Sequence, residues 1–222
     1  MHRICAFAAI AAAAVSCSAF ARSAIHLGAN PIEVNGTILR VTPQLGGPDF
    51  DGASTVDRWT VTVDAAGVYF FNALSWELDW STNTAVDVNG DGEIAFIDTY
   101  LRLFRDDGDL TPDDQVGKND DRFFHAPADA DGSIYGYDSY LSLFLAPGDY
   151  ILAVGAYHMS IPDVMLGLDV DNNFYPVTWS DDLQEFLPSD HGDYRVTMGL
   201  VPAPGGAAVG VLSLLAALRR RR

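Results

Sequence analysis

The chain has 222 residues, of which 49% are hydrophobic, and its formal net charge at pH 7 is −17. This length is enough for one domain with a substantial core. A surface this acidic repels nucleic acid and anionic lipid, so nucleic acid is not an expected partner, and it is suited to binding cations.

Residues 1–21 have the form of a secretory signal peptide. Arg3 gives a basic start, an alanine-rich apolar stretch follows, and a small-x-small cleavage site ends at Ala21. We expect export to the cell envelope or the extracellular space, with cleavage after Ala21. Lipoprotein processing at Cys17 is the alternative.

The predicted mature domain, residues 22–200, has no cysteine, because Cys5 and Cys17 both lie in the signal segment. This excludes a disulfide, a thiol nucleophile and a cysteine metal ligand. All 30 acidic residues but only 8 of the 13 basic ones lie in this domain, which gives it a formal charge of −22. We expect its stability to come from a core and from bound ions.

The domain has the pattern of short β-strands separated by turns. Segments that alternate, or that are rich in β-branched and aromatic residues, are bounded by glycine, proline and aspartate. No long stretch has the 3.6-residue period of a helix, so we predict an all-β, antiparallel sandwich or barrel. The predicted strands are residues 37–41, 58–63, 68–71, 150–154 and 194–198.

Residues 87–98 match the twelve-residue pattern of a calcium-binding loop. Ca²⁺ takes about six to eight hard oxygen ligands, and alternate residues of a tight turn aim their side chains at one point. Gly92 would supply the bend, and Glu93 would contribute its backbone carbonyl. The alternative is a solvated aspartate–glycine turn. The predicted ligands are Asp87, Asn89, Asp91, Glu93 and Asp98.

Residues 91–104 recur forty residues later as residues 131–144, with eight of fourteen positions identical. We expect the two copies to occupy equivalent places, each an acidic turn that leads into a strand with inward-facing leucines. The second copy predicts a weaker metal loop, because Pro127 stands at its first ligand position. Its candidate ligands are Asp129, Asp131 and Asp138.

The order of several short motifs between residues 57 and 198 resembles the bacterial pre-peptidase C-terminal domain, with residues 79–93 as an insertion. The resemblance implies a jelly-roll-like β-sandwich with a binding or stabilising role rather than a catalytic one. The motifs that carry it are residues 64–67, 98–104, 119–121, 138–141, 146–150 and 155–157.

The paired acidic loops also resemble dockerin modules, in which each calcium loop precedes a helix and the module docks on a cohesin partner. Residues 145–150 have a strand–turn–strand pattern instead, which argues that this resemblance ends at the loop.

The last residues, 201–222, resemble a PEP-CTERM-type sorting signal, with Val-Pro-Ala-Pro where that family has Val-Pro-Glu-Pro. The apolar run 207–218 is too short to cross a bilayer of about 30 Å unaided, and the positive-inside rule places the arginines in the cytoplasm. The resemblance implies a transient membrane anchor that an exosortase-like protease removes. The alternative is a hydrophobic helix docked on the domain. The motif residues are Val201, Pro202, Pro204, Arg219, Arg220, Arg221 and Arg222.

The sequence contains no pattern typical of an enzyme. It lacks a Gly-x-Ser-x-Gly elbow, a His-Glu-x-x-His motif and a phosphate-binding glycine loop. His125, His158 and His191 are isolated in the sequence, which is typical of surface or turn residues rather than general bases.

We therefore expect a non-enzymatic protein of the cell surface or extracellular matrix, sorted through its C-terminal segment and stabilised by Ca²⁺. The alternatives are a dockerin-like interaction module and a carbohydrate-binding module for envelope polysaccharide. Exposed aromatic rings stack on sugars, although aromatic residues near loops also cap the ends of a core. The candidate aromatic residues are Trp76, Trp80, Tyr135, Tyr137 and Trp179.

Overall fold

The structure, a computed structural model, describes residues 24–41, 53–76, 78–79, 84–121, 136–170, 176–180 and 182–202. The predicted signal peptide lies outside these ranges, and so does the sorting segment from residue 203 onward. Six further residues named above also lie outside them: Trp80, His125, Pro127, Asp129, Asp131 and Tyr135.

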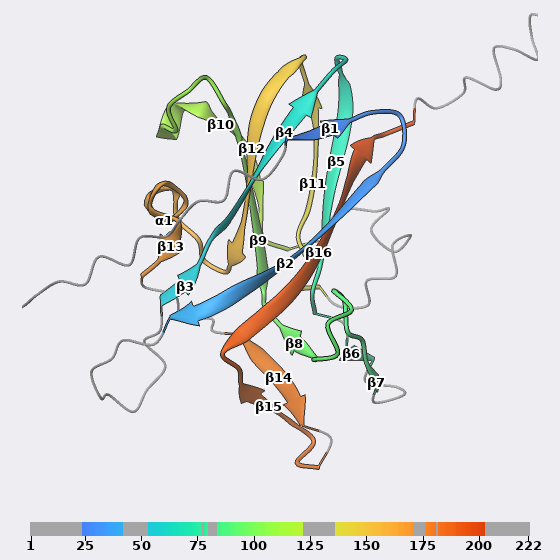
Figure 1. Cartoon of the computed structure of the whole chain (residues 1–222), viewed down its shortest axis with the longest axis vertical. Coiled ribbons are helices and arrows are strands. Elements are labelled where there is room, and N and C mark those ends of the chain that lie inside the picture. Colours follow the sequence, from blue (N-terminus) through green and yellow to red (C-terminus); the bar gives the residue numbers. More distant parts are fainter. Residues whose placement is uncertain are drawn as a thin grey trace, which may run out of the picture.

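The strands form two main sheets that face each other, which confirms the prediction of an all-β protein with an antiparallel β-sandwich (Figure 1). The first sheet has the order β1 (Ile25–Leu27), β4 (Asp57–Val63), β12 (Gly148–Ala156), β9 (Thr99–Arg105), β10 (Gln115–Asn119). The second has the order β11 (Tyr140–Leu145), β5 (Gly67–Leu74), β16 (His191–Leu200), β2 (Ile32–Val41), β3 (Ala53–Thr55), β13 (Leu168–Asp169).

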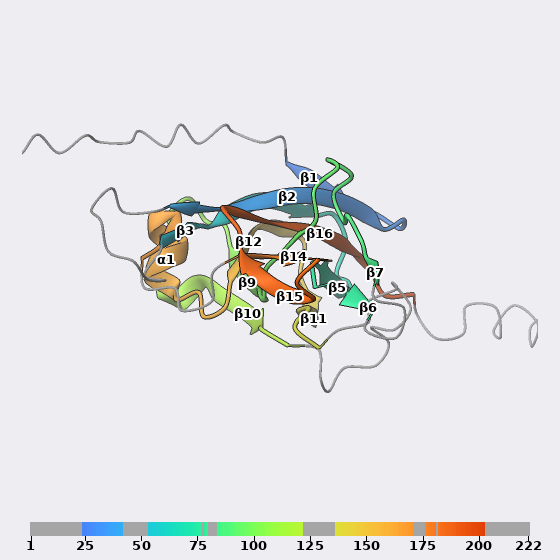
Figure 2. The same cartoon turned by 90° about the horizontal axis from the view of Figure 1, so that it is seen from below.

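All five predicted strands lie within observed strands of these two sheets, namely β2, β4, β5, β12 and β16. The alternating pattern predicts these strands correctly because one face of each strand packs against the core and the other faces solvent. The short edge strand β1 pairs with β4 in parallel, whereas the long central strands pair antiparallel. Figure 2 shows the two layers, with β2 and β16 in one and β9 and β10 in the other.

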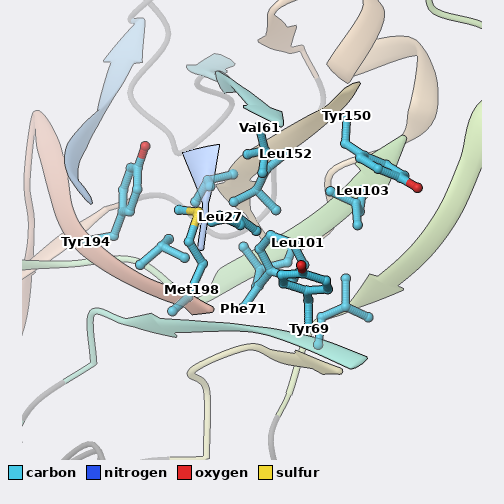
Figure 3. Packing of buried hydrophobic residues seen from close by; sticks show 14 of the residues in the cluster. Leu27, Val61, Tyr69, Phe71, Leu101, Leu103, Tyr150, Leu152, Tyr194 and Met198 are labelled. Carbon is cyan, nitrogen blue, oxygen red and sulfur yellow. The ribbon is translucent and has the colours of Figure 1, made fainter. Parts of the chain in front are cut away.

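The core lies between the sheets and is built from large apolar side chains of both (Figure 3). Tyr69, Phe71 and Met198 from the second sheet meet Leu101 and Leu152 from the first, and all five are at most 1% exposed. Burial of such side chains is the main stabilising contribution to a cysteine-free domain, at about 1.5–3 kcal/mol for each.

The two copies of the internal repeat form β9 and β11, one in each main sheet. This confirms that each copy leads into a strand whose leucines face the core: Leu101 is fully buried, and Leu141 is nearly so. The copies differ on their outer faces. Phe104 is buried in a second apolar cluster with Val164, whereas Phe144, on the edge strand β11, is 68% exposed.

A short helix, α1 (Ile161–Leu166), lies beside that second cluster. The sequence carries its start and stop signals. Ser160 and Asp163 form a capping box, and Gly167 ends the helix in a left-handed conformation with φ of +75°. The single 3-10 turn in the described ranges is η1 (Pro112–Asp114).

A small third sheet closes one end of the sandwich, in the order β15 (Glu185–Pro188), β14 (Val177–Ser180), β8 (Ala95–Phe96). In Figure 1 it lies at the lower end, where β16 begins. The pair β6 (Leu78–Asp79) and β7 (Thr84–Ala85) completes the described strands. In the described residues, strands rather than helices follow the acidic segments of the two copies, so the docking helices of a dockerin are missing from these described segments.

Candidate functional site

The acidic loop before β8 is held by its own side chains. The carboxylate of Asp87 accepts hydrogen bonds from the backbone N–H groups of Gly90 at 2.6 Å and Gly92 at 2.8 Å. Asp91 accepts one from the N–H of Glu93 at 2.9 Å. The glycines have φ of +80° and +96°, a region that residues with a side chain rarely adopt.

Asn89 links the two aspartates of this loop. Its Nδ2 donates to Asp91 Oδ2 at 2.9 Å, and its Oδ1 accepts from the N–H of Asp91 at 3.0 Å. Asp87, Asn89 and Asp91 are thus gathered in one turn, with oxygen atoms that suit a hard cation. The N–H bonds to Asp91 lower the pKa of its carboxyl, first that from Glu93 and then the side-chain bond from Asn89, so the group stays ionised.

Asp98 lies with a different group of carboxylates from the one that the sequence predicted. Burial raises its pKa to about 8, with further contributions from the charges of Asp121, Asp120 and Asp138. Between the loop and Asp98, residues 95–96 form the extended strand β8.

Asp138, the equivalent of Asp98 in the second copy, is fully buried. Its Oδ1 accepts hydrogen bonds from the backbone N–H groups of Ser75 at 2.8 Å and Trp76 at 2.9 Å, at the end of β5. The carboxylate therefore accepts the backbone N–H groups that follow the last residue of β5, as an aspartate does for the free N–H groups at the start of a helix. Its partners in the predicted second loop, Asp129 and Asp131, lie outside the described residues.

His191 is surrounded by carboxylates, in contrast to its isolated place in the sequence. Its Nδ1 lies 2.7 Å from Asp190 Oδ1, and its Nε2 lies 3.2 Å from Glu93 Oε2 and 3.7 Å from Asp193 Oδ2. The spacing His-x-Asp at the start of the observed strand β16, which begins three residues before the predicted strand, places His191 and Asp193 on one face. Glu93 is almost a hundred residues away, so only the tertiary fold brings it to them.

Asp193 is 1% exposed, and its Oδ1 accepts a hydrogen bond from the Thr37 hydroxyl at 2.8 Å. Its Oδ2 has no hydrogen-bond partner among the described residues. Burial raises the pKa of this carboxyl. The charges of Asp91 and Asp87 raise it further, while the Thr37 bond and His191 lower it. The acidic loop therefore lies close enough to Asp193 for their charges to interact.

The aromatic candidates that the structure describes gather at the end closed by the third sheet. The ring of Trp76 lies 5.4 Å from that of Tyr137 and 5.0 Å from that of Phe186, which also lies 5.0 Å from Trp179. Trp76 further contacts the buried ring of Phe96 at 5.5 Å. These aromatic rings pack mainly against one another and close the end of the core. Tyr137 nevertheless remains 38% exposed.

Of the other histidines, His158 packs against the rings of Tyr100 and Tyr157. His26 lies 3.6 Å from Asp64 on the surface, and both side chains are more than half exposed. His125 lies outside the described residues. Within the described ranges, no group of three or more His, Cys, Asp or Glu side chains could hold a metal ion.

The sorting motif begins within the described residues. The N–H of Val201 donates to the carbonyl of Val68 at 2.8 Å, so the chain stays paired with β5 to this point. Pro204 and Arg219 to Arg222 lie outside the described residues. In the part of the chain that the structure describes, we find no helix with the length and apolar character needed to cross a bilayer.

No protein-family model matches the chain, and no curated protein matches it. Among solved structures, the chain is similar to the pre-peptidase C-terminal domain of collagenase from Bacillus anthracis, at 14% identity and a TM-score of 0.36. The similarity covers 79% of this chain and 93% of that domain. The β-sandwich is shown by the strand pairing described above.

Proposed function

We propose that this chain is a non-enzymatic exported protein of the cell envelope or extracellular matrix, and that Ca²⁺ bound by the acidic loop stabilises its β-sandwich. The observation that carries the proposal is the convergence of Asp87, Asn89 and Asp91 in one turn before β8. The backbone carbonyl of Glu93 would add a fourth oxygen, and the loop is exposed, so water could supply further ligands.

The physical advantage of a bound dication lies in the repulsion that it removes. Asp87 and Asp91 are like charges in a domain that already carries a large negative excess, and their charges also act on the buried Asp193. Ca²⁺ would bind the folded loop and not the unfolded chain, so binding would shift the folding equilibrium. The gain is about 2.7 kcal/mol when free Ca²⁺ is about a hundred times the dissociation constant.

The test is the melting temperature of the protein in millimolar Ca²⁺ and in chelator. We expect a rise of about 5–10 °C with Ca²⁺, since 1 kcal/mol corresponds to about 2–4 °C at this size. Asp91→Ala should remove most of this rise. Asp107→Ala, which removes the same charge from another exposed turn, should keep it.

Mg²⁺ is the control for general screening, because it fits a large flexible oxygen cage poorly. An equal rise with Mg²⁺, or an equal rise in Asp91→Ala, would contradict a specific calcium loop. No rise with either ion would show that the loop is an ordinary turn.

Export and sorting form the second part of the proposal, and their support is the sequence pattern at the two ends of the chain. The C-terminal segment would hold the protein in the inner membrane, and an exosortase-like protease would remove this segment before delivery. Replacing Arg219 to Arg222 with neutral residues should leave the protein mis-sorted, with an unprocessed mass. Unchanged delivery together with an unchanged mature mass would contradict the sorting role.

A carbohydrate-binding module for envelope polysaccharide is the second candidate function. It is favoured by the partly exposed side chain of Tyr137, whose ring lies 5.4 Å from that of Trp76, since sugar rings stack on exposed aromatic faces. Binding to extracted envelope polysaccharide should be lost in Tyr137→Ala and kept in Phe144→Ala, which removes an exposed ring from β11. Equal binding by both variants would exclude this aromatic group as the sugar site.

A further inference from the structure

An apolar patch lies on the outer face of the second main sheet, beside the last described residues. Phe144 of β11 and Val68 of β5 are register partners, so their side chains lie next to each other on one face of the sheet. Phe144 is 68% exposed and Val68 is 43% exposed. Val201 lies on the other side of Val68, because its N–H donates to the Val68 carbonyl at 2.8 Å. Three apolar residues therefore form a row across this end of the sheet.

Phe70 extends the patch along β5. It lies two residues after Val68, so its side chain points to the same face. Its ring is stacked on that of Tyr140 at 6.5 Å, and a Cβ atom at Gly199 would lie 3.5 Å from it. Neither β5 nor β11 contains a charged residue, although the predicted mature domain carries a formal charge of −22. We call the following residues the outer patch: Val68, Phe70, Phe144 and Val201.

The first copy of the internal repeat shows an equivalent surface that is covered. Phe104, the counterpart of Phe144, lies on the outer face of the first main sheet beside its register partner Ile151. Phe104 is fully buried, because Val164 of α1 packs in the same apolar cluster. The outer patch has the same pairing of a phenylalanine with an aliphatic residue, but its phenylalanine is exposed. A short apolar segment that packed there would bury Phe144 as the cluster around α1 buries Phe104.

The residues that follow the outer patch in the sequence include such a segment. Residues 203–206 contain Pro204, Gly205 and Gly206, which are typical turn residues, and residues 207–218 are the apolar run. Four residues span at most about 14 Å, whereas the two strand spacings from β16 to β11 amount to about 10 Å. The apolar run therefore begins within reach of Phe144.

Charge complementarity favours contact between this segment and the domain. β16 ends at the end of the sandwich where β4 and β9 also end and β12 begins (Figure 1). Directly after the apolar run come Arg219 to Arg222. Opposite charges attract within about 10 Å at about 0.1 M salt, so the arginines favour return of the segment to this acidic end. Among the described residues, the exposed carboxylates at this end are Asp64, Asp107, Asp109 and Asp149, against one exposed arginine, Arg105.

We propose that residues 207–218 pack on the outer patch and cover Phe144 and Val68 for as long as they are part of the chain. The outer patch is thus an intramolecular docking surface, and its occupant is the apolar segment of the same chain. This docking concerns the chain outside a membrane, so it is independent of the proposed sorting role. Removal of the segment by a protease would uncover the patch on the mature protein.

The experiment is disulfide formation within the full chain, which carries Cys5→Ser and Cys17→Ser so that the introduced cysteines are the only ones. Ser142→Cys lies on the outer face of β11, two residues before Phe144, and Ser213→Cys lies within the apolar run. The protein is kept dilute and free of lipid, so that reaction between chains is slow. Docking holds the two thiols at a high effective concentration, and a disulfide between them should form at least about ten times faster than in the control pair.

The control pair is Leu183→Cys with Ser213→Cys. Leu183 is 61% exposed and lies between β14 and β15, at the opposite end of the sandwich from Val201. Its thiol would be as accessible as that at position 142, but the docked segment would not lie beside it. The two pairs therefore separate docking from free movement of the segment.

A further variant tests the outer patch itself. Phe144→Ser, added to the pair at positions 142 and 213, removes the most exposed apolar side chain of the patch and should slow the disulfide at least about fivefold. Because this side chain is exposed, the variant should fold normally. Leu39→Ser is the matched control, since Leu39 is 52% exposed on β2, away from the patch, and its loss should leave the rate unchanged.

Equal rates for the pairs at Ser142 and Leu183 would overturn the proposal, and so would an unchanged rate in Phe144→Ser. Rapid formation of a disulfide-linked dimer by Ser142→Cys alone would overturn it in favour of a second copy of the chain as the occupant. These rates are independent of the mature mass of the variant at Arg219 to Arg222, which tests sorting.

Discussion

Thr99 and Ser139 occupy equivalent positions in the two copies of the internal repeat, and they are hydrogen-bonded to each other. The N–H of Ser139 donates to Thr99 Oγ1 at 2.8 Å, and the Ser139 hydroxyl donates to the Thr99 carbonyl. Both residues are fully buried. The repeat thus does more than supply two similar strands, because its copies join the two main sheets where β9 and β11 begin.

This contact predicts that Ser139→Ala destabilises the domain by about 1–3 kcal/mol, the cost of leaving a buried polar group without its partner. The hydroxyl also lies 3.1 Å from the carbonyl of Asn119 and 2.9 Å from that of Asp120, so its loss affects the end of β10 as well. Urea denaturation measures the change. Ser142→Ala, at an exposed position of the same strand, is the control and should change stability by less than about 0.5 kcal/mol.

A second prediction concerns Gly36, which faces Tyr194 across β2 and β16. A Cβ atom at Gly36 would lie 2.2 Å from the Tyr194 hydroxyl oxygen. That hydroxyl accepts a hydrogen bond from Trp59 Nε1 at 2.8 Å and donates one to Asp57 Oδ2 at 2.6 Å, so the ring joins the two sheets and cannot move without loss.

Gly36→Ala should therefore destabilise the domain by about 1–3 kcal/mol, the usual cost of overpacking a core. Thermal unfolding compares it with Gly28→Ala, where an added Cβ atom meets nothing within 4 Å. Equal melting temperatures for the two variants would show that the Tyr194 ring can move aside.

The sequence was informative wherever a structure depends on neighbours in the chain. The strands that became β4 and β12 could be predicted because alternate residues such as Val61 and Val63 face the core. The turn from Asp87 to Glu93 could be predicted because its bonds span five residues or fewer.

Relationships that depend on tertiary packing could not be predicted. Asp98 fits the twelfth position of a loop by count alone, yet β8 carries it to Asp120, Asp121 and Asp138. His191 appeared isolated because Glu93 reaches it only through the contact of β8 with β16. A pattern of ligand spacing describes one segment, whereas these carboxylates come from segments that only the fold brings together.

The last prediction concerns Asp98 and pH. Burial, followed by the charges of Asp121, Asp120 and Asp138, raises the folded-state pKa to about 8 from an ordinary value of 3.8. Below about pH 4 the carboxyl is protonated in both states and contributes nothing. Between pH 4 and 8 the unfolded chain releases this proton while the folded domain keeps it, so rising pH favours unfolding, by at most about 1.4 kcal/mol for each pH unit. Above pH 8 both states are ionised and the penalty stays constant.

Asp98→Asn cannot ionise, so it removes this penalty. Relative to the natural protein, the variant should gain stability steadily from pH 4 to pH 8 and then level off. The measurement is the free energy of unfolding in urea at each pH, in chelator, because a bound cation would hold the carboxyl ionised. Asp107→Asn, in an exposed turn, should show a difference that does not vary with pH. A similarly flat difference for Asp98→Asn would mean that Asp98 is ionised in the folded domain at neutral pH, with its repulsion relieved by local opening of the carboxylate group.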